Sequence, residues 1–161
     1  MKQGGKINAV GTPDKPIVMT SEKEEPGAWG GIHICGRAHT NAEGGKGSSE
    51  IGGAVYGGND DADNSGTLQY IRLEYTGFAF DEEHEANGIS FYGVGNGTIV
   101  DHCQAYKGSD DGFEFFGGSV NVSNLVAVSC SDDSFDWTEG WNGKGTNLVA
   151  YQEAESTLGY D

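Results

Sequence analysis

The chain has 161 residues, a length typical of one domain, and its 25 acidic against 9 basic side chains give a formal net charge of −16. This charge argues against nucleic acid or an anionic membrane surface as a partner and favours cations or neutral ligands. No apolar run reaches the ~18 residues of a transmembrane helix, so we expect no membrane span. The three cysteines form no CxxC pair and are expected to be free core thiols.

The N-terminal half contains short strand patterns separated by inserts. Residues 4–7 lead directly into a strand, with no apolar segment of a signal peptide before it. Residues 31–34 and 70–73 alternate apolar and polar side chains, which is typical of half-buried strands. A Gly-rich insert, residues 36–66, separates them. We expect residues 31–34 to occupy the same place in the fold as residues 70–73.

An acidic loop lies just before residues 70–73. Asp61, Asp63 and the Ser65-Gly66 pair imitate the first half of an EF-hand loop. The twelfth position would be Arg72 rather than Glu, and no flanking helices are predicted, so the loop is not an EF-hand. Two interpretations remain open: a calcium site that uses Asp61 and Asp63, or a solvated loop of Asx turns.

The C-terminal half repeats itself. Residues 109–115 (SDDGFEF) match residues 131–137 (SDDSFDW) at an offset of 22, and residues 87–91 match them more weakly at an offset of 24. A second set of matching segments runs in parallel, with residues 102–105, 124–127 and 147–150. Each repeat therefore holds at least two short strands that bury one face only when the repeats stack.

These repeats predict an all-β fold, a right-handed parallel β-helix whose coils contain about 22–24 residues, with long loop inserts. Residues 1–161 are expected to form a single β-helix domain. A β-sandwich would not give matching residues at constant offset. The predicted inward positions, Trp137 included as a core residue, are Ile71, Cys103, Leu125 and Leu148; Leu73, Ala105, Ala127 and Ala150; Ile89, Phe113 and Phe135; and Phe91, Phe115 and Trp137.

Several segments resemble one group of proteins. The segments GGKI (4–7), WGGI (29–32), YGGND (56–60) and DDGFEFFGG (110–118) are similar to those of bacterial secreted or cell-surface β-helix proteins of the pectin-lyase-like group, many of unassigned function. The resemblance implies a secreted or cell-surface location. It also implies that a natural full-length protein has further coils on both sides. The chain would then be a fragment, able to self-associate through uncapped β-helix ends.

Stacking of the repeats places carboxylates above one another. The predicted pairs are Asp110 with Asp132, Asp111 with Asp133, and Glu114 with Asp136 on the outward side of the strand. Two carboxylates ~5 Å apart repel by roughly 1 kcal/mol in water and by ~3 kcal/mol at an effective dielectric near 20. Bound Ca²⁺ or raised pKa values would relieve this repulsion. The alternative is a ladder of turns whose Asp side chains cap backbone N–H groups and face solvent.

The function expected from these features is a binding or scaffold module, directed toward glycans or another cell-surface polymer and stabilised by Ca²⁺. Glu114, Asp136, Trp29 and Trp141 are the candidate ligand-binding residues, since aromatic rings stack on sugars. The alternative is a polysaccharide lyase or glycoside hydrolase that would use Asp110, Asp111 and Asp133. Against the alternative, the Gly-His-Gly and Arg-x-Lys segments of polygalacturonase-like β-helices are absent.

Overall fold

The computed structural model describes residues 1–81 and 84–154. Within this range the chain is built from short strands and one 3₁₀ turn, η1 (Glu43–Gly45). The strands are β1 (Ile7–Val10), β2 (Ile17–Met19), β3 (Ile32–Cys35), β4 (Gly47–Ser48), β5 (Val55–Tyr56), β6 (Gly66–Glu74), β7 (Ile89–Tyr92), β8 (Ile99–Tyr106), β9 (Phe113–Phe116), β10 (Asn121–Val128), β11 (Phe135–Thr138) and β12 (Gly145–Tyr151).

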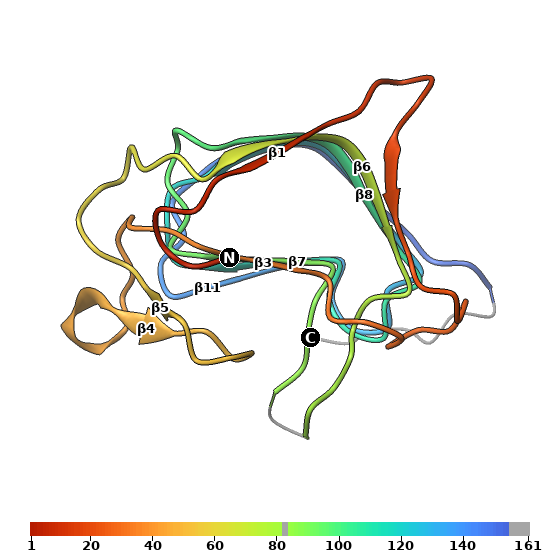
Figure 1. Cartoon of the computed structure of the whole chain (residues 1–161), viewed down its shortest axis with the longest axis horizontal. Helices are drawn as coiled ribbons and strands as arrows, with labels where there is room; N and C mark the ends of the chain where they lie inside the picture. The colour runs from red at the N-terminus through yellow and green to blue at the C-terminus, as the bar shows by residue number, and fades with distance from the viewer. Residues whose placement is uncertain (82–83, 155–161) are drawn as a thin grey trace.

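Two parallel sheets form the body of the molecule. One has the order β1-β6-β8-β10-β12, with β2 also paired to β6, and the other has the order β11-β9-β7-β3. The chain alternates between the sheets, so it winds as a right-handed parallel β-helix whose coils lie almost on top of one another in Figure 1. The predicted fold is therefore confirmed.

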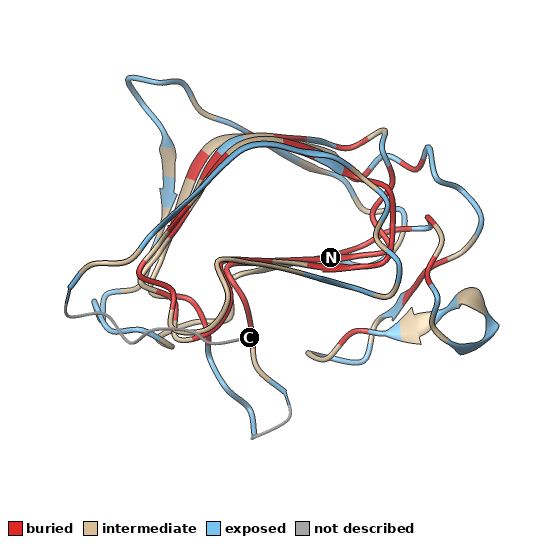
Figure 2. Ribbon diagram, turned by 180° about the vertical axis from the view of Figure 1, so that it is seen from behind, coloured by how far each residue is buried: buried red, intermediate tan, exposed pale blue. Residues whose placement is uncertain are grey.

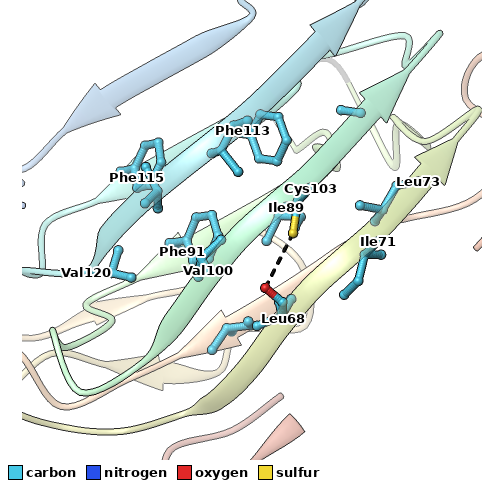
Figure 3. Close-up of a cluster of buried hydrophobic side chains, with 14 of the residues drawn as sticks. Leu68, Ile71, Leu73, Ile89, Phe91, Val100, Cys103, Phe113, Phe115 and Val120 are labelled. Carbon is cyan, nitrogen blue, oxygen red and sulfur yellow. Dashed lines mark hydrogen bonds between the residues drawn. The ribbon is translucent and has the colours of Figure 1, made fainter. Parts of the chain in front are cut away.

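The register of the strands confirms the predicted columns. Phe113 pairs with Ile89 on one side and Phe135 on the other, and Ala127 pairs with both Ala105 and Ala150. The side chains of these columns fill the interior up to β10, as Figure 3 shows for one part of it, and the buried positions in Figure 2 follow the strands of both sheets. In the last described coil the predicted inward residues Leu148 and Ala150 are exposed. Stacked rings add to the packing: the Phe91 and Phe115 centroids are 5.0 Å apart. All three cysteines are free and buried, as predicted.

The long strands turn a corner at the same position in every coil. Tyr70, His102, Asn124 and Asn147 have φ values of 50°, 51°, 54° and 55°. This left-handed conformation is uncommon for residues other than Gly, and Asn tolerates it best. The corner bends β6, β8, β10 and β12, so that each strand forms two sides of its coil (Figure 1).

The predicted position of one strand in the fold was wrong. Residues 32–34 belong to β3, which pairs with β7 through Ile32 and Ile89, not with β6. The partners of β6 in the first coil are β1 and β2, which a short hairpin around Thr12 and Lys15 separates. Alternation of apolar and polar residues indicates a half-buried strand, but it does not show to which of the two sheets the strand belongs. The hairpin also interrupts the repeat in the first coil, so the sequence match to β6 is not visible there.

The insert between β3 and β6 covers the outer face of the second sheet. Its β4–β5 hairpin brings Tyr56 against the outward rings of Tyr92 and Phe116. The Tyr56 hydroxyl donates to both carboxylate oxygens of Glu139 at 2.9 Å, and Thr40 Oγ1 donates to the same carboxylate at 2.5 Å. These hydrogen bonds hold the insert to the turn that follows β11.

Candidate functional site

Two of the three predicted carboxylate pairs, Asp110 with Asp132 and Glu114 with Asp136, come together where the turns before β9 and β11 stack, whereas the Asp133 carboxylate joins no converging group among the described residues. The Gly112 N–H donates to the Asp133 carbonyl at 2.8 Å, which places these two turns directly over one another. The register of the strands that follow pairs Glu114 with Asp136. We call the set Asp110, Asp111, Glu114, Asp132, Asp133 and Asp136 the acidic ladder.

Four of these side chains converge on a fifth, Asp111. Carboxylate oxygens of Asp110, Asp111 and Asp132 lie within 4.8 Å of one another, and so do those of Asp111, Glu114 and Asp136. The two groups share Asp111, which makes it the centre of the acidic ladder. Such short separations between like charges require either a cation or bound protons.

Burial intensifies this repulsion. Asp110 is 8% exposed and Asp111 is 7% exposed. Burial, together with Glu85 and Asp132, raises the pKa of Asp110 to about 7, and burial with Asp110 raises the pKa of Asp111 to about 8. Burial and the Glu50 carboxylate raise the pKa of Glu114 to about 10. Without a counter-ion, Asp111 and Glu114 therefore retain protons at neutral pH, and Asp110 is partly protonated.

One side chain of the ladder caps a turn, as the alternative interpretation predicted. Asp111 Oδ1 accepts a hydrogen bond from the backbone N–H of Asp133 at 2.8 Å, so it caps a turn as an Asx residue does. It does so while buried, rather than on a solvated edge. The second Asp111 oxygen is not needed for this cap, which leaves it available for a ligand.

The inserts bring further carboxylates to the site. Glu50, from the insert before β5, accepts a hydrogen bond from the Tyr92 hydroxyl at 3.2 Å. Its negative charge helps to raise the pKa values of Asp110 and Glu114. The negative charge of Glu85, from the loop before β7, helps to raise the pKa of Asp110. Neither residue was predicted from the sequence, because loops that interrupt the repeat carry no periodic signal.

The acidic loop before β6 is arranged differently from the ladder. Asp61 Oδ1 accepts from the backbone N–H of His39 at 3.0 Å and lies 2.9 Å from His39 Nδ1. Asp63 Oδ2 accepts from the Arg37 N–H at 2.9 Å, and its Oδ1 lies 3.6 Å from the Arg37 guanidinium. Among the described residues, neither Asp61 nor Asp63 joins a group of three converging metal-ligand side chains. Both side chains hold two parts of the insert together.

Two of the three tryptophans pack against the core, and the third is exposed. Trp29 and Trp141 pack against the core, and their indole N–H groups donate to the carbonyls of Glu74 at 2.7 Å and Val120 at 3.1 Å. Trp141 also stacks on Phe115, with 4.6 Å between the centroids. The expectation that Trp137 is a core residue was wrong, because it is 61% exposed.

The reason for this exposure lies in the edge position of β11. Trp137 pairs in register with Phe115, as the column predicted, but β11 is the edge strand of its sheet among the described residues. An inward position is buried only where another coil covers it. Trp137 instead lines a shallow pocket of about 300 Å³ together with Phe135 and two members of the ladder, Asp133 and Asp136.

Comparison with known proteins adds one finding. No curated protein and no solved structure matches the chain. No helix among residues 1–81 and 84–154 has the length and apolar character needed to cross a membrane. A family model described as a pectate-lyase-like beta helix domain matches residues 1–161, the same range over which the stacked coils were predicted. The chain therefore belongs to the family of pectate-lyase-like β-helix domains.

Proposed function

We propose that the chain is a non-catalytic β-helix module, secreted or at the cell surface, whose acidic ladder binds Ca²⁺. The observation that carries the proposal is that buried Asp111 belongs to two groups of three carboxylates, and within each group the oxygens lie within 4.8 Å of one another. Ca²⁺ takes six to eight oxygen ligands in flexible geometry, mostly from carboxylates and carbonyls. The ladder supplies donors of this type, and a bound cation would cancel their mutual repulsion.

Calorimetric titration with Ca²⁺ and thermal melting with and without a chelator test this proposal. We expect a saturable binding heat and a higher melting temperature with Ca²⁺, since a ligand that binds only the folded state stabilises it. Asp111→Asn should reduce both effects. Asp14→Asn is the matched control, because it removes the same charge from an exposed hairpin. Absence of heat and of any melting shift in the wild type would rule the proposal out.

A glycan is the ligand we propose for the module. Support comes from the exposed Trp137 ring in a pocket that also contains the Asp133 and Asp136 side chains. Aromatic rings stack on the apolar face of a sugar, and nearby carboxylates accept hydrogen bonds from its hydroxyls. Binding of neutral oligosaccharides should be lost in Trp137→Ala and kept in Tyr151→Ala, which removes an exposed ring from β12. Equal binding by both variants would exclude the pocket.

A second candidate function is a polysaccharide lyase or hydrolase. It is favoured by one observation: the pKa values of Asp110 and Asp111, about 7 and about 8, leave protonated acids available near neutral pH. Against inverting hydrolysis by Asp110 and Asp111, oxygens of these two carboxylates lie within 4.8 Å, closer than the roughly 6.5–9.5 Å between the carboxyls of inverting glycosidases. Assays on uronate-containing polysaccharides, compared between wild type and Asp111→Asn, decide between the two functions.

A further inference from the structure

Asn87 occupies the rung of the solenoid directly next to Asp111. The Gly88 N–H donates to the Asp111 carbonyl at 2.9 Å, in the same way that the Gly112 N–H donates to Asp133. The turns before β7, β9 and β11 therefore stack in one column, and this column reads Asn87, Asp111, Asp133. The first rung carries an amide where the other two carry carboxylates.

The Asn87 side chain is buried and half satisfied. It is 1% exposed, and its Nδ2 donates to Ser90 Oγ at 3.1 Å and to Glu114 Oε2. Its Oδ1 is also buried but accepts no hydrogen bond from any residue that the structure describes. Buried polar atoms are nearly always paired, so an orphaned oxygen requires an explanation.

The neighbourhood of the Asn87 amide favours a cation. The amide lies against Glu114, whose carboxylate belongs with Asp111 and Asp136 to one of the two converging groups. A cation would displace the proton that the raised pKa leaves on Glu114, and the ionised carboxylate would then have no hydrogen to donate to Oδ1. Amide oxygens are, however, ordinary ligands of Ca²⁺ alongside carboxylates.

We propose that Asn87 Oδ1 is a ligand of the cation on the acidic ladder and completes an all-oxygen site for a hard divalent ion. This inference rests on the proposed cation binding and adds to it a ligand outside the repeat of aspartates. Nδ2 holds Glu114 in position while Oδ1 contacts the ion. A neutral ligand at this rung also avoids adding one more charge beside Glu114.

Titration of the whole chain with Tb³⁺, a luminescent probe that replaces Ca²⁺, tests the proposal. Luminescence lifetimes in H₂O and D₂O count the water molecules on the bound ion. Asn87→Ala should bind about ten- to a hundred-fold more weakly, with one additional water on the ion in place of the amide. Ser90→Ala is the matched control, because it removes the other Nδ2 partner and leaves Oδ1 in place; its affinity and water count should equal those of the wild type.

Asn87→Asp keeps the test decisive if the alanine variant does not fold. Aspartate occupies the equivalent rung in the next two coils, so the backbone accommodates it, and its carboxylate oxygen should preserve the wild-type water count. An extra water in Asn87→Asp, or an unchanged affinity and water count in Asn87→Ala, would overturn the role of Asn87. Failure of the wild type to bind Tb³⁺ and Ca²⁺ would instead overturn the proposed function.

Discussion

The backbone N–H of Asp133 donates a hydrogen bond to Asp111 Oδ1 at 2.8 Å, across one coil of the solenoid. The side chain at the centre of the acidic ladder therefore also fixes the backbone of the turn above it. Charge and shape at this site are coupled, since any change at Asp111 alters both the repulsion among the carboxylates and the support of the next turn.

Substitutions of Asp111 separate these two effects. Asp111→Asn keeps an oxygen that accepts from the Asp133 N–H and removes one charge, so in chelator at pH 8 we expect a gain of about 1–3 kcal/mol in the free energy of unfolding. Asp111→Ala leaves that N–H without its acceptor and should be about 1–3 kcal/mol less stable than Asp111→Asn. Urea denaturation measures both. Equal stabilities would show that the hydrogen bond contributes nothing.

The stability of the cation-free protein should depend on pH through the ladder. The pKa values of Asp110 and Asp111 are raised to about 7 and about 8 by burial and by neighbouring carboxylates, whereas unfolded Asp titrates near ~3.9. Between these values the folded state holds protons that the unfolded state has released. Its free energy of unfolding therefore falls as the pH rises from about 4 to about 8.

The matched comparison for this pH dependence is the double variant Asp110→Asn/Asp111→Asn. Its free energy of unfolding in chelator, measured by urea denaturation at a series of pH values, should decline less steeply than that of the wild type over the same range. Parallel curves for the two proteins would contradict the raised pKa values.

Calcium affinity should rise over the same pH range, because protons on the ladder must leave before the cation binds. Calorimetry in two buffers with different enthalpies of protonation measures the number of protons released. We expect about one to three protons, from Asp110, Asp111 and Glu114, whose pKa values are all raised. Identical binding heats in the two buffers would show that no proton is displaced and would argue against binding at the ladder.

Phe115 and Trp137 offer a comparison within one inward column. Phe115 is 1% exposed between Phe91 and Trp141, so Phe115→Ala should cost about 3–5 kcal/mol. Trp137 is 61% exposed, so Trp137→Ala should cost less than about 1 kcal/mol. Chemical denaturation of both variants checks this difference. A cost at Trp137 close to that at Phe115 would mean that Trp137 is covered in solution.

We expect Asp101 to stabilise the corner of the coils through its charge, because it accepts hydrogen bonds from Ser123 and Asn124. Burial acts to raise its pKa, but hydrogen bonds from Asn124, Ser123 and His102 outweigh burial and lower the pKa to about 2. Asp101→Ala leaves these donors unpaired, with an expected cost of about 1–3 kcal/mol at pH 7. The charge contribution is present above the unfolded pKa of ~3.9 and is lost as the pH falls toward 2. The difference in the free energy of unfolding between wild type and Asp101→Ala, measured at a series of acidic pH values, should therefore narrow as the pH falls. A constant difference would contradict this role.

The sequence was sufficient for the repeat and for the acidic ladder, because both follow from residues that recur at a fixed offset. Phe113 above Ile89, and Glu114 paired with Asp136, are direct consequences of that offset. The sequence did not predict that Glu50 and Glu85 lie near the ladder. Both come from inserts, and their position depends on loop conformation.

Two other misses have physical causes in the stack itself. The place of β3 could not be derived from its alternating pattern, because the two sheets share that pattern and differ only in their neighbours. The exposure of Trp137 depends on what covers the last described coil, and a column of matching residues does not carry this information. The proposed role of Asn87 was likewise not predicted, since an amide among aspartates looks like an imperfect copy of the repeat.

The left-handed corner at Tyr70, His102, Asn124 and Asn147 makes loop length independent of strand register. Tyr70 and His102 are 32 residues apart, yet β6 and β8 pair as regularly as β8 and β10, whose corners are 22 residues apart. Lengthening a loop between corners then costs only closure entropy, about 0.6 kcal/mol for each doubling. Loops such as the one that carries Glu85 can therefore diverge in length and chemistry while the scaffold beneath them keeps its geometry, and new binding segments could be grafted there.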